Sequence, residues 1–252
     1  MQHATLRLGV ALAASILTAH AQEQSQMLHL TFVSVNPGMG PDFEEMQKTI
    51  NDASRKQGTK RREVWTTAIF GEPMYVTVFP VASMATYDSP NPMRASMNDI
   101  EYSRFVQRMS RIVRGARQVM VRTRPDLGIS SGEHRPNTMA VATSVNVMYG
   151  KQAEFERYLK NEVMAALRRA GVKDAWVHQT VMGGPMTEYT LLTPFDKWES
   201  MENGSPLERT LGPDGLLALR AKAAGTVTSI QNVVTRRIET LGYMPAQPAT
   251  GH

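Results

Sequence analysis

Short runs of alternating apolar and polar residues, separated by segments with helical spacing, make up most of this chain. In the runs 28–35 and 140–148, apolar residues alternate and share one face of an extended strand. After each run, apolar residues return every three or four positions, beginning at Phe43 and at Phe155. The pattern predicts a strand followed by an amphipathic helix, twice in one chain.

Each predicted helix is followed by a hairpin, a second helix and a final strand. The hairpins turn at the Gly-x-Pro sequences 71–73 and 183–185, because glycine and proline interrupt regular structure. The second helices follow proline-rich stretches at 89–92 and 205–206. Four residues of the first of these helices are expected on one face: Met97, Ile100, Met109 and Ile112. The expected strands are 28–35, 62–70, 74–79, 117–124, 140–148, 175–182, 187–193 and 230–238.

The two series of elements align with each other at a nearly constant offset. Residues 71–74 fall on residues 183–186 at an offset of 112, and Leu127-Gly128 falls on Leu241-Gly242 at an offset of 114. A period of this length suits a duplicated domain rather than a solenoid repeat. The predicted parts are a first half at 22–128, a polar linker at 129–138, a second half at 139–243 and a disordered tail at 244–252.

The order strand, helix, strand, strand, helix, strand in each half predicts a ferredoxin-like βαββαβ unit. In such a unit, an antiparallel sheet of four strands carries both helices on one face. The other face is left bare, and a large exposed apolar face favours association. The expected fold class is therefore α+β, with two fused halves whose sheets cover each other.

Three features occur in both halves and carry a family resemblance. They are the opening strands that lead into Pro41-Asp42-Phe43 and Ala153-Glu154-Phe155, the hairpins that turn at Gly71 and Gly183, and Tyr87 and Trp198 after the third strands. On these residues the chain resembles the dimeric α+β barrel superfamily, and within it tandem members related to the NIPSNAP and antibiotic-biosynthesis-monooxygenase groups. The resemblance implies an intramolecular barrel. It leaves the activity open, because the superfamily includes cofactor-independent oxygenases, haem enzymes and isomerases.

The first 21 residues have the composition of a signal peptide. They contain one cation, Arg7, an uncharged stretch at 8–19 and the small-x-small sequence Ala19-His20-Ala21. The uncharged stretch is too short to span a membrane, which takes about 20 helical residues. Export to the periplasm or the exterior is predicted, with cleavage near Ala21 and no transmembrane segment in the mature protein. The chain has no cysteine, which excludes thiolate nucleophiles and cysteine metal sites.

Aromatic residues of the two hairpins and polar residues of a neighbouring strand are candidates for lining a small-molecule pocket in each half. They are Trp65, Tyr75, Trp176 and Tyr189, with Ser144 and Asn146. Large apolar surface with few polar groups is typical of such pockets, and plain core packing is the alternative. His178 shares a strand face with Trp176 and is the candidate catalytic residue, with a structural, hydrogen-bonded histidine as the alternative. Its counterpart at an offset of 112 is Thr66, and the two tryptophans align only at 111.

A series of arginines is a second candidate site, since no acidic residue occurs between 104 and 124. Its members are Arg104, Arg108, Arg111 and Arg114. Spacings of four and three place them on one helix face. There they could bind an anionic surface or partner, or remain solvated. The formal net charge of +5 favours anionic partners on encounter, but nucleic acid is not expected because no reading motif is present.

No cofactor and no metal ion are predicted. His178 and Met182 lie about 13 Å apart along an extended strand and cannot share one ion. Chlorite dismutases, which this architecture resembles, use one axial histidine, so haem stays open as an alternative. The sequence predicts an exported protein that binds a small apolar or aromatic compound, with cofactor-independent oxygenation or isomerisation as its activity if it is an enzyme. A non-catalytic envelope interaction module that uses the basic helix face is the alternative.

Overall fold

A computed structural model of the chain describes residues 25–132 and 138–243. Its strands are β1 (Met27–Val35), β2 (Glu63–Thr67), β3 (Tyr75–Val81), β4 (Val113–Thr123), β5 (Met139–Val147), β6 (Trp176–Met182), β7 (Glu188–Phe195) and β8 (Val227–Arg237). Its α-helices are α1 (Gly40–Lys56), α2 (Pro92–Ser96), α3 (Asp99–Ile112), α4 (Gln152–Tyr158), α5 (Met164–Arg169) and α6 (Pro206–Ala221). The predicted signal peptide at 1–21, the tail at 244–252 and residues 133–137 of the predicted linker lie outside the described residues.

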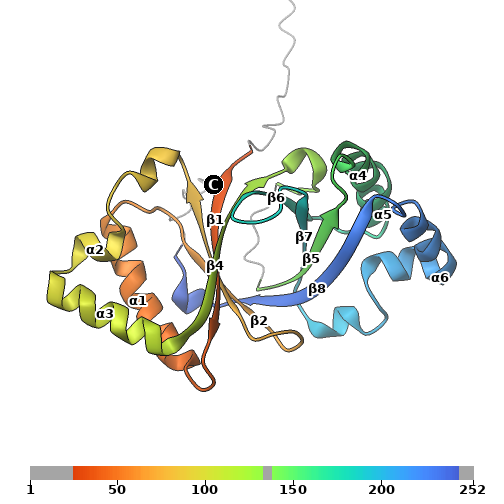
Figure 1. Ribbon diagram of the computed structural model, residues 1–252. Coiled ribbons are helices and arrows are strands. Elements are labelled where there is room, and N and C mark those ends of the chain that lie inside the picture. Colours follow the sequence, from red (N-terminus) through yellow and green to blue (C-terminus); the bar gives the residue numbers. More distant parts are fainter. Residues whose placement is uncertain (1–24, 133–137, 244–252) are drawn as a thin grey trace, which may run out of the picture.

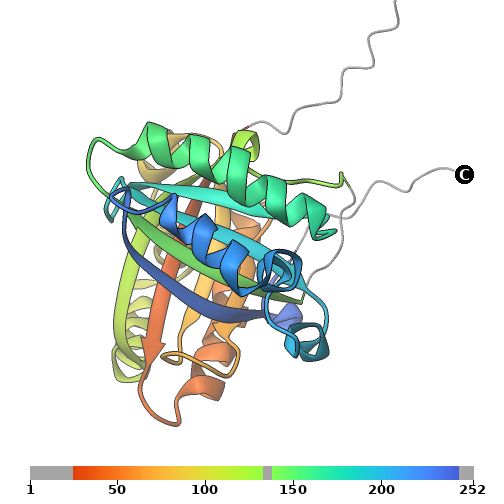
Figure 2. The same ribbon diagram turned by 90° about the vertical axis from the view of Figure 1, so that its right-hand side faces the viewer.

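The eight strands close into one antiparallel barrel in the order β1-β3-β2-β8-β5-β7-β6-β4. Figure 1 shows the halves side by side, with strands in the centre and helices outermost. In Figure 2, α4, α5 and α6 cover the outer face of the second half's sheet. The pairings β2–β8 and β4–β6 join the two sheets edge to edge. The predicted α+β class and the intramolecular barrel are confirmed.

Alternation along the strands separates a helix-facing surface from the barrel interior. In the first half, Val33 of β1 packs with Phe43 of α1, which is fully buried. In the second half, Val145 of β5 packs with Phe155 of α4 in the equivalent place. These cores lie between each sheet and its own helices. The alternate residues of each strand therefore face the interior of the barrel.

The predicted second helix of the first half is broken into α2 and α3. Met97 is extended and lies between the two helices, and Ile100 is 65% exposed, so the predicted apolar face is wrong over its first two residues. The break has a local cause, because Asn98 caps a new helix. Its side chain accepts a hydrogen bond from the backbone N–H of Glu101, whose carboxylate accepts one from the backbone N–H of Asn98.

The residues that follow the last strand of each half pack against the other half. Leu127, in the short 3₁₀ turn Pro125–Leu127, is 4% exposed and belongs to the core of the second half. Leu241, in the turn Glu239–Leu241, is 1% exposed, and its carbonyl oxygen accepts a hydrogen bond from the side chain of Asn51 in α1 at 2.7 Å. The Leu-Gly sequences that align at an offset of 114 are therefore reciprocal arms, which fasten the two halves to each other.

Gly128 is predicted to be intolerant of a side chain, because its arm lies directly against the other half. A Cβ at this position would lie 2.7 Å from the carbonyl oxygen of Ala175, which is backbone and cannot move away easily. We expect Gly128→Ala to destabilise the protein by about 1–3 kcal/mol in urea unfolding. Gly115→Ala is the matched control, since nothing lies within 4 Å of a Cβ there. Equal stability of the two variants would contradict the close approach of the arm.

Candidate functional site

Strand pairing places two rows of side chains on the interior face of the barrel, one in each half. The first-half row consists of Arg117, Phe32, Val76, Trp65 and Arg237. The second-half row, in equivalent positions, consists of Gln231, Ser144, Thr190, His178 and Thr123. The middle of the first row is aromatic and aliphatic, whereas every member of the second row is polar. None of the ten residues is fully buried, so solvent reaches both rows.

The pairing register identifies which residues correspond between the halves. Trp65 pairs with β3 and β8, and His178 makes the equivalent pairs with β7 and β4. The offset between β2 and β6 is therefore 113, which corrects the expectation that Thr66 is the counterpart of His178. At this offset the counterpart of Trp176 is Glu63, and the two tryptophans are not equivalent. The halves differ at both interior positions of these strands.

Glu63 lies two residues before Trp65 on the interior side of β2. It is buried, and its carboxylate accepts hydrogen bonds from the indole Nε1 of Trp65 at 2.9 Å and from Nε of Arg61 at 2.7 Å. The Arg61 guanidinium also forms an ion pair with it. Charge-assisted hydrogen bonds of this kind are short and directional. They hold a charged carboxylate and an indole together at the barrel wall.

His178 faces this group from the opposite wall, because β2 and β6 lie opposite each other in the closed strand order. Burial lowers the pKa of His178 to about 4, while the negative charge of Glu63 raises it and the positive charge of Arg61 lowers it. The imidazole is therefore neutral at neutral pH. Trp176 precedes His178 by two residues and shares its interior face. His178 and Trp176 share one interior face, as the alternation of that strand predicts, and Trp65, Glu63 and Arg61 lie at the opposite wall.

Tyr75 and Tyr189 lie on the other side of their strands, against the helices, so their predicted place in the pocket is corrected. Tyr75 donates a hydrogen bond to Glu44 of α1 at 2.9 Å, and Tyr189 donates one to Glu156 of α4 at 2.7 Å. Burial and the neighbouring carboxylate raise the pKa of Tyr75 to about 12, and the same causes raise the pKa of Tyr189. Tyr189 is 1% exposed. The two tyrosines are equivalent core residues.

Ser144 and Asn146 face the interior from β5, as predicted from the alternation of that strand. Ser144 is next to Thr190 and Gln231 in the second-half row. Asn146 donates a hydrogen bond to the hydroxyl of Ser229 at 3.0 Å. These two residues add to the polar groups of the second half's inner wall, beside the apolar ring of Trp176.

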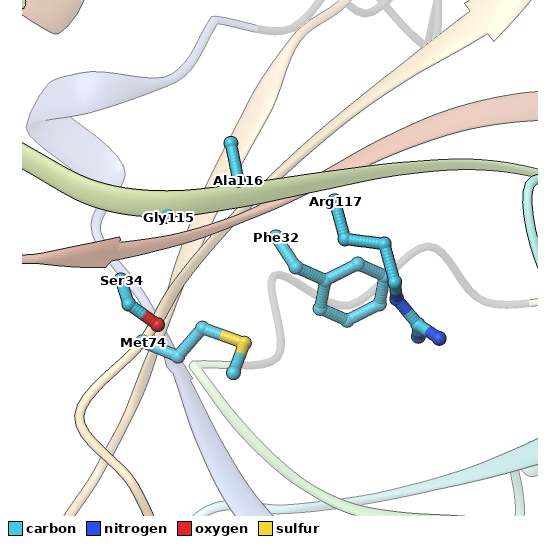
Figure 3. A pocket seen from close by; sticks show the side chains of 6 residues that line it. All are labelled: Phe32, Ser34, Met74, Gly115, Ala116 and Arg117. Carbon is cyan, nitrogen blue, oxygen red and sulfur yellow. The ribbon is translucent and has the colours of Figure 1, made fainter. Parts of the chain in front are cut away.

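An open depression of about 350 Å³ lies at the first-half row. Figure 3 shows Phe32, the thioether of Met74 and the guanidinium of Arg117 around it, with Ser34 close by. The Arg117 guanidinium carbon lies 5.0 Å from the centre of the Phe32 ring, a cation–π contact. Phe32 belongs to the same row as Trp65, with Val76 of β3 between them, so the depression lies at the β1–β4 end of this row.

The predicted arginine series is divided between two elements. Arg104, Arg108 and Arg111 lie on α3, whereas Arg114 belongs to β4 and forms an ion pair with Glu72. The expectation that all four share one helix face is therefore corrected, because α3 ends at Ile112. Three arginines remain together on α3.

Glu63 and Arg61 are functional candidates that the predicted site omits. Alternation with Trp65 is the sequence signal that places Glu63 on the interior face. Arg61 precedes the strand, so only its contact with Glu63 identifies it. Within residues 25–132 and 138–243, no cluster of histidine and acidic side chains could hold a metal ion.

Solved structures with a similar fold include an anthrone oxidase-like protein, with a TM-score of 0.59 and 13% identity over 86% of this chain and 93% of that chain. A candidate monooxygenase from Fusobacterium nucleatum subsp. nucleatum has a TM-score of 0.56 and 12% identity over 86% of this chain and 94% of that chain. A mutant chlorite dismutase from Candidatus Nitrospira defluvii has a TM-score of 0.50 and 7% identity over 86% of this chain and 93% of that chain. No family profile matches the chain, and neither does any curated protein.

These identities are so low that the comparisons show the fold alone. The fold is the dimeric α+β barrel, closed in this protein by the two halves of a single chain. Together with the interior site, it defines the class of protein: a single-chain α+β barrel whose two inner walls carry different chemistry.

Proposed function

We propose that this protein is an exported barrel enzyme that binds a small aromatic compound in its interior and removes a proton from it with His178. The observation that carries the proposal is the position of His178 on the interior face of β6, opposite the Glu63–Arg61 pair at the inner wall of β2. Trp65 and Trp176 on the two walls provide flat apolar surfaces for an aromatic ring. The anthrone oxidase-like protein with the same fold is named for an aromatic compound, anthrone.

The proposed step begins with a phenolic or enolic hydroxyl beside the imidazole. His178 accepts its proton, and the bound anion beside the new imidazolium offsets the cost of a charge in a buried site. Glu63 stabilises the imidazolium from the opposite wall. A substrate enolate of this kind reacts with O₂ as the co-reactant. For anthrone, one oxygen atom enters the ring carbon to give anthraquinone, and the other leaves as water with the two hydrogens of that carbon.

Haem, the cofactor of chlorite dismutases, does not fit His29 and His178, the two histidines among residues 25–132 and 138–243 that the structure describes. His29 lies on the helix-facing side of β1, where its ring nitrogens contact Tyr87 at 2.8 Å and Thr31 at 3.4 Å. His178 has a tryptophan beside it on its own strand face. The proposed reaction therefore uses no haem.

The export part of the proposal rests on the predicted signal peptide at 1–21. In the part of the chain that the structure describes, no helix has the length and apolar character needed to cross a membrane.

A panel of hydroxylated aromatic compounds, with anthrone as the first member, tests the proposed function. Binding is followed by quenching of tryptophan fluorescence, and turnover by oxygen uptake and quinone absorbance. His178→Gln should lower kcat/KM by at least about 100-fold, the usual range for loss of a general base. His29→Gln is the matched control and should leave kcat/KM unchanged, because that ring lies outside the barrel. Full turnover by His178→Gln, or failure of every panel member to bind the parent protein, would overturn the proposal.

A further inference from the structure

A second depression, of about 390 Å³, lies outside the barrel between α1 and α3. Its α3 wall carries Arg104, Gln107, Arg108 and Arg111, and the opposite side is formed by Met39 and Asp42 at the start of α1. The three arginines are exposed and follow one another at spacings of four and three residues. The depression therefore gathers three guanidinium groups on one side.

Only the middle arginine is neutralised by acidic side chains. Arg108 forms ion pairs with Glu45 at 2.6 Å and with Asp42 at 3.4 Å, which tie α3 to α1 and raise the pKa of Arg108. Arg104 and Arg111, on either side of it, have no carboxylate partner among the residues that the structure describes. The guanidinium groups of Arg104 and Arg111, which have no carboxylate partner there, thus lie on either side of the ion-paired Arg108.

Like charges at these spacings destabilise a helix slightly, by about 0.2–0.5 kcal/mol per pair. An anion bound between them would remove this repulsion. Guanidinium groups offer forked donors that match the oxygens of phosphate, and the Gln107 amide adds a further donor at the same wall. A phosphate dianion can accept hydrogen bonds from several donors at once, because its oxygens point in different directions. A carboxylate has only two oxygens and accepts from fewer donors.

We propose that the depression between α1 and α3 binds a phosphate group, with Arg104 and Arg111 as its ligands on either side of Arg108, which its ion pairs with Glu45 and Asp42 hold in place. The phosphate group belongs either to a free phosphorylated compound or to the headgroup of an anionic lipid. The site is independent of the barrel interior, because its arginines belong to α3, and Figure 1 shows this helix on the outer side of the sheet.

The experiment compares the parent protein with the double variant Arg104→Gln/Arg111→Gln, which keeps good helix formers on α3. Calorimetric titration with inorganic phosphate tests the free ligand. Co-sedimentation with phosphatidylcholine vesicles that contain phosphatidic acid tests the lipid headgroup. Arg157→Gln/Arg169→Gln on the second half's outer helices is the control with the same charge change.

We expect the parent protein to bind in at least one of the two assays, and the Arg104→Gln/Arg111→Gln variant to bind at least tenfold more weakly in that assay. Arg157→Gln/Arg169→Gln should bind as the parent does. Binding of inorganic phosphate identifies a free ligand, and binding of vesicles alone identifies a lipid headgroup. The proposal is overturned if the parent protein binds neither probe, or if both double variants lose affinity equally.

Discussion

Replacing Leu241 with alanine should destabilise the protein by about 2–5 kcal/mol, the range for truncation of a fully buried leucine. Leu241 is 1% exposed, although it follows the last strand of the second half, because it packs against α1 in the first. Truncation leaves a cavity at the joint between the halves. Urea unfolding measures the loss, and Leu217→Ala, at a residue that is 68% exposed, should change stability by less than about 0.5 kcal/mol.

Hydrogen exchange locates the same effect in the structure. Because the arm of Leu241 lies against the first half, Leu241→Ala should reduce amide protection in α1 and β2, far from the substitution along the chain. The isolated bridge between Arg62 and Tyr243 should open with it. Loss of protection confined to β8 would show that the arm does not fasten the two halves.

The parent protein should lose stability between pH 7 and pH 5, and replacing His178 with glutamine should make this loss smaller by about 2 kcal/mol. The imidazole has a pKa of about 4 in the folded protein, and about 6.5 in an unfolded chain. Below the higher value, the unfolded chain takes up a proton that the folded protein does not. The contribution of the neutral His178 imidazole to the stability of the folded protein is therefore complete above pH 6.5 and is lost as the pH falls towards 4.

Urea unfolding of both proteins at several pH values measures this difference. Carboxylates contribute to acid sensitivity in both proteins, so the variant isolates the part that comes from His178. Burial also lowers the pKa of His29, but less strongly. His29→Gln should therefore change the pH dependence in the same direction and by a smaller amount. Equal losses in the parent protein and in His178→Gln would mean that the imidazole is not held neutral in the barrel.

Local patterns account for most of the fold. The alternation in 28–35 and 140–148 matches β1 and β5 to within one residue at each end, because a strand with one face in a core needs apolar residues at every second position. The break before α3 was missed, since the apolar spacing continues through it. The capping residues Asn98 and Glu101, not the apolar period, decide where that helix begins.

The candidate site was predicted only in part. His178 and Trp176 share a face through local alternation, which the sequence shows directly. The grouping of Tyr75 and Tyr189 with the tryptophans was wrong, because a shift of one residue moves a side chain to the other face of a sheet. An offset taken from the hairpin turns cannot show such a shift.

The sequence by itself determined the succession of strands and helices, their arrangement in two halves with the same order of elements, and the interior faces of β5 and β6. All of these depend on residues that are close together in the chain. Only the tertiary structure decided that Glu63 and His178 face each other, because β2 and β6 meet across a barrel closed by pairing with β8 and β4. The register of those pairings is set by contacts between the halves, and it determines which chemistry the interior presents.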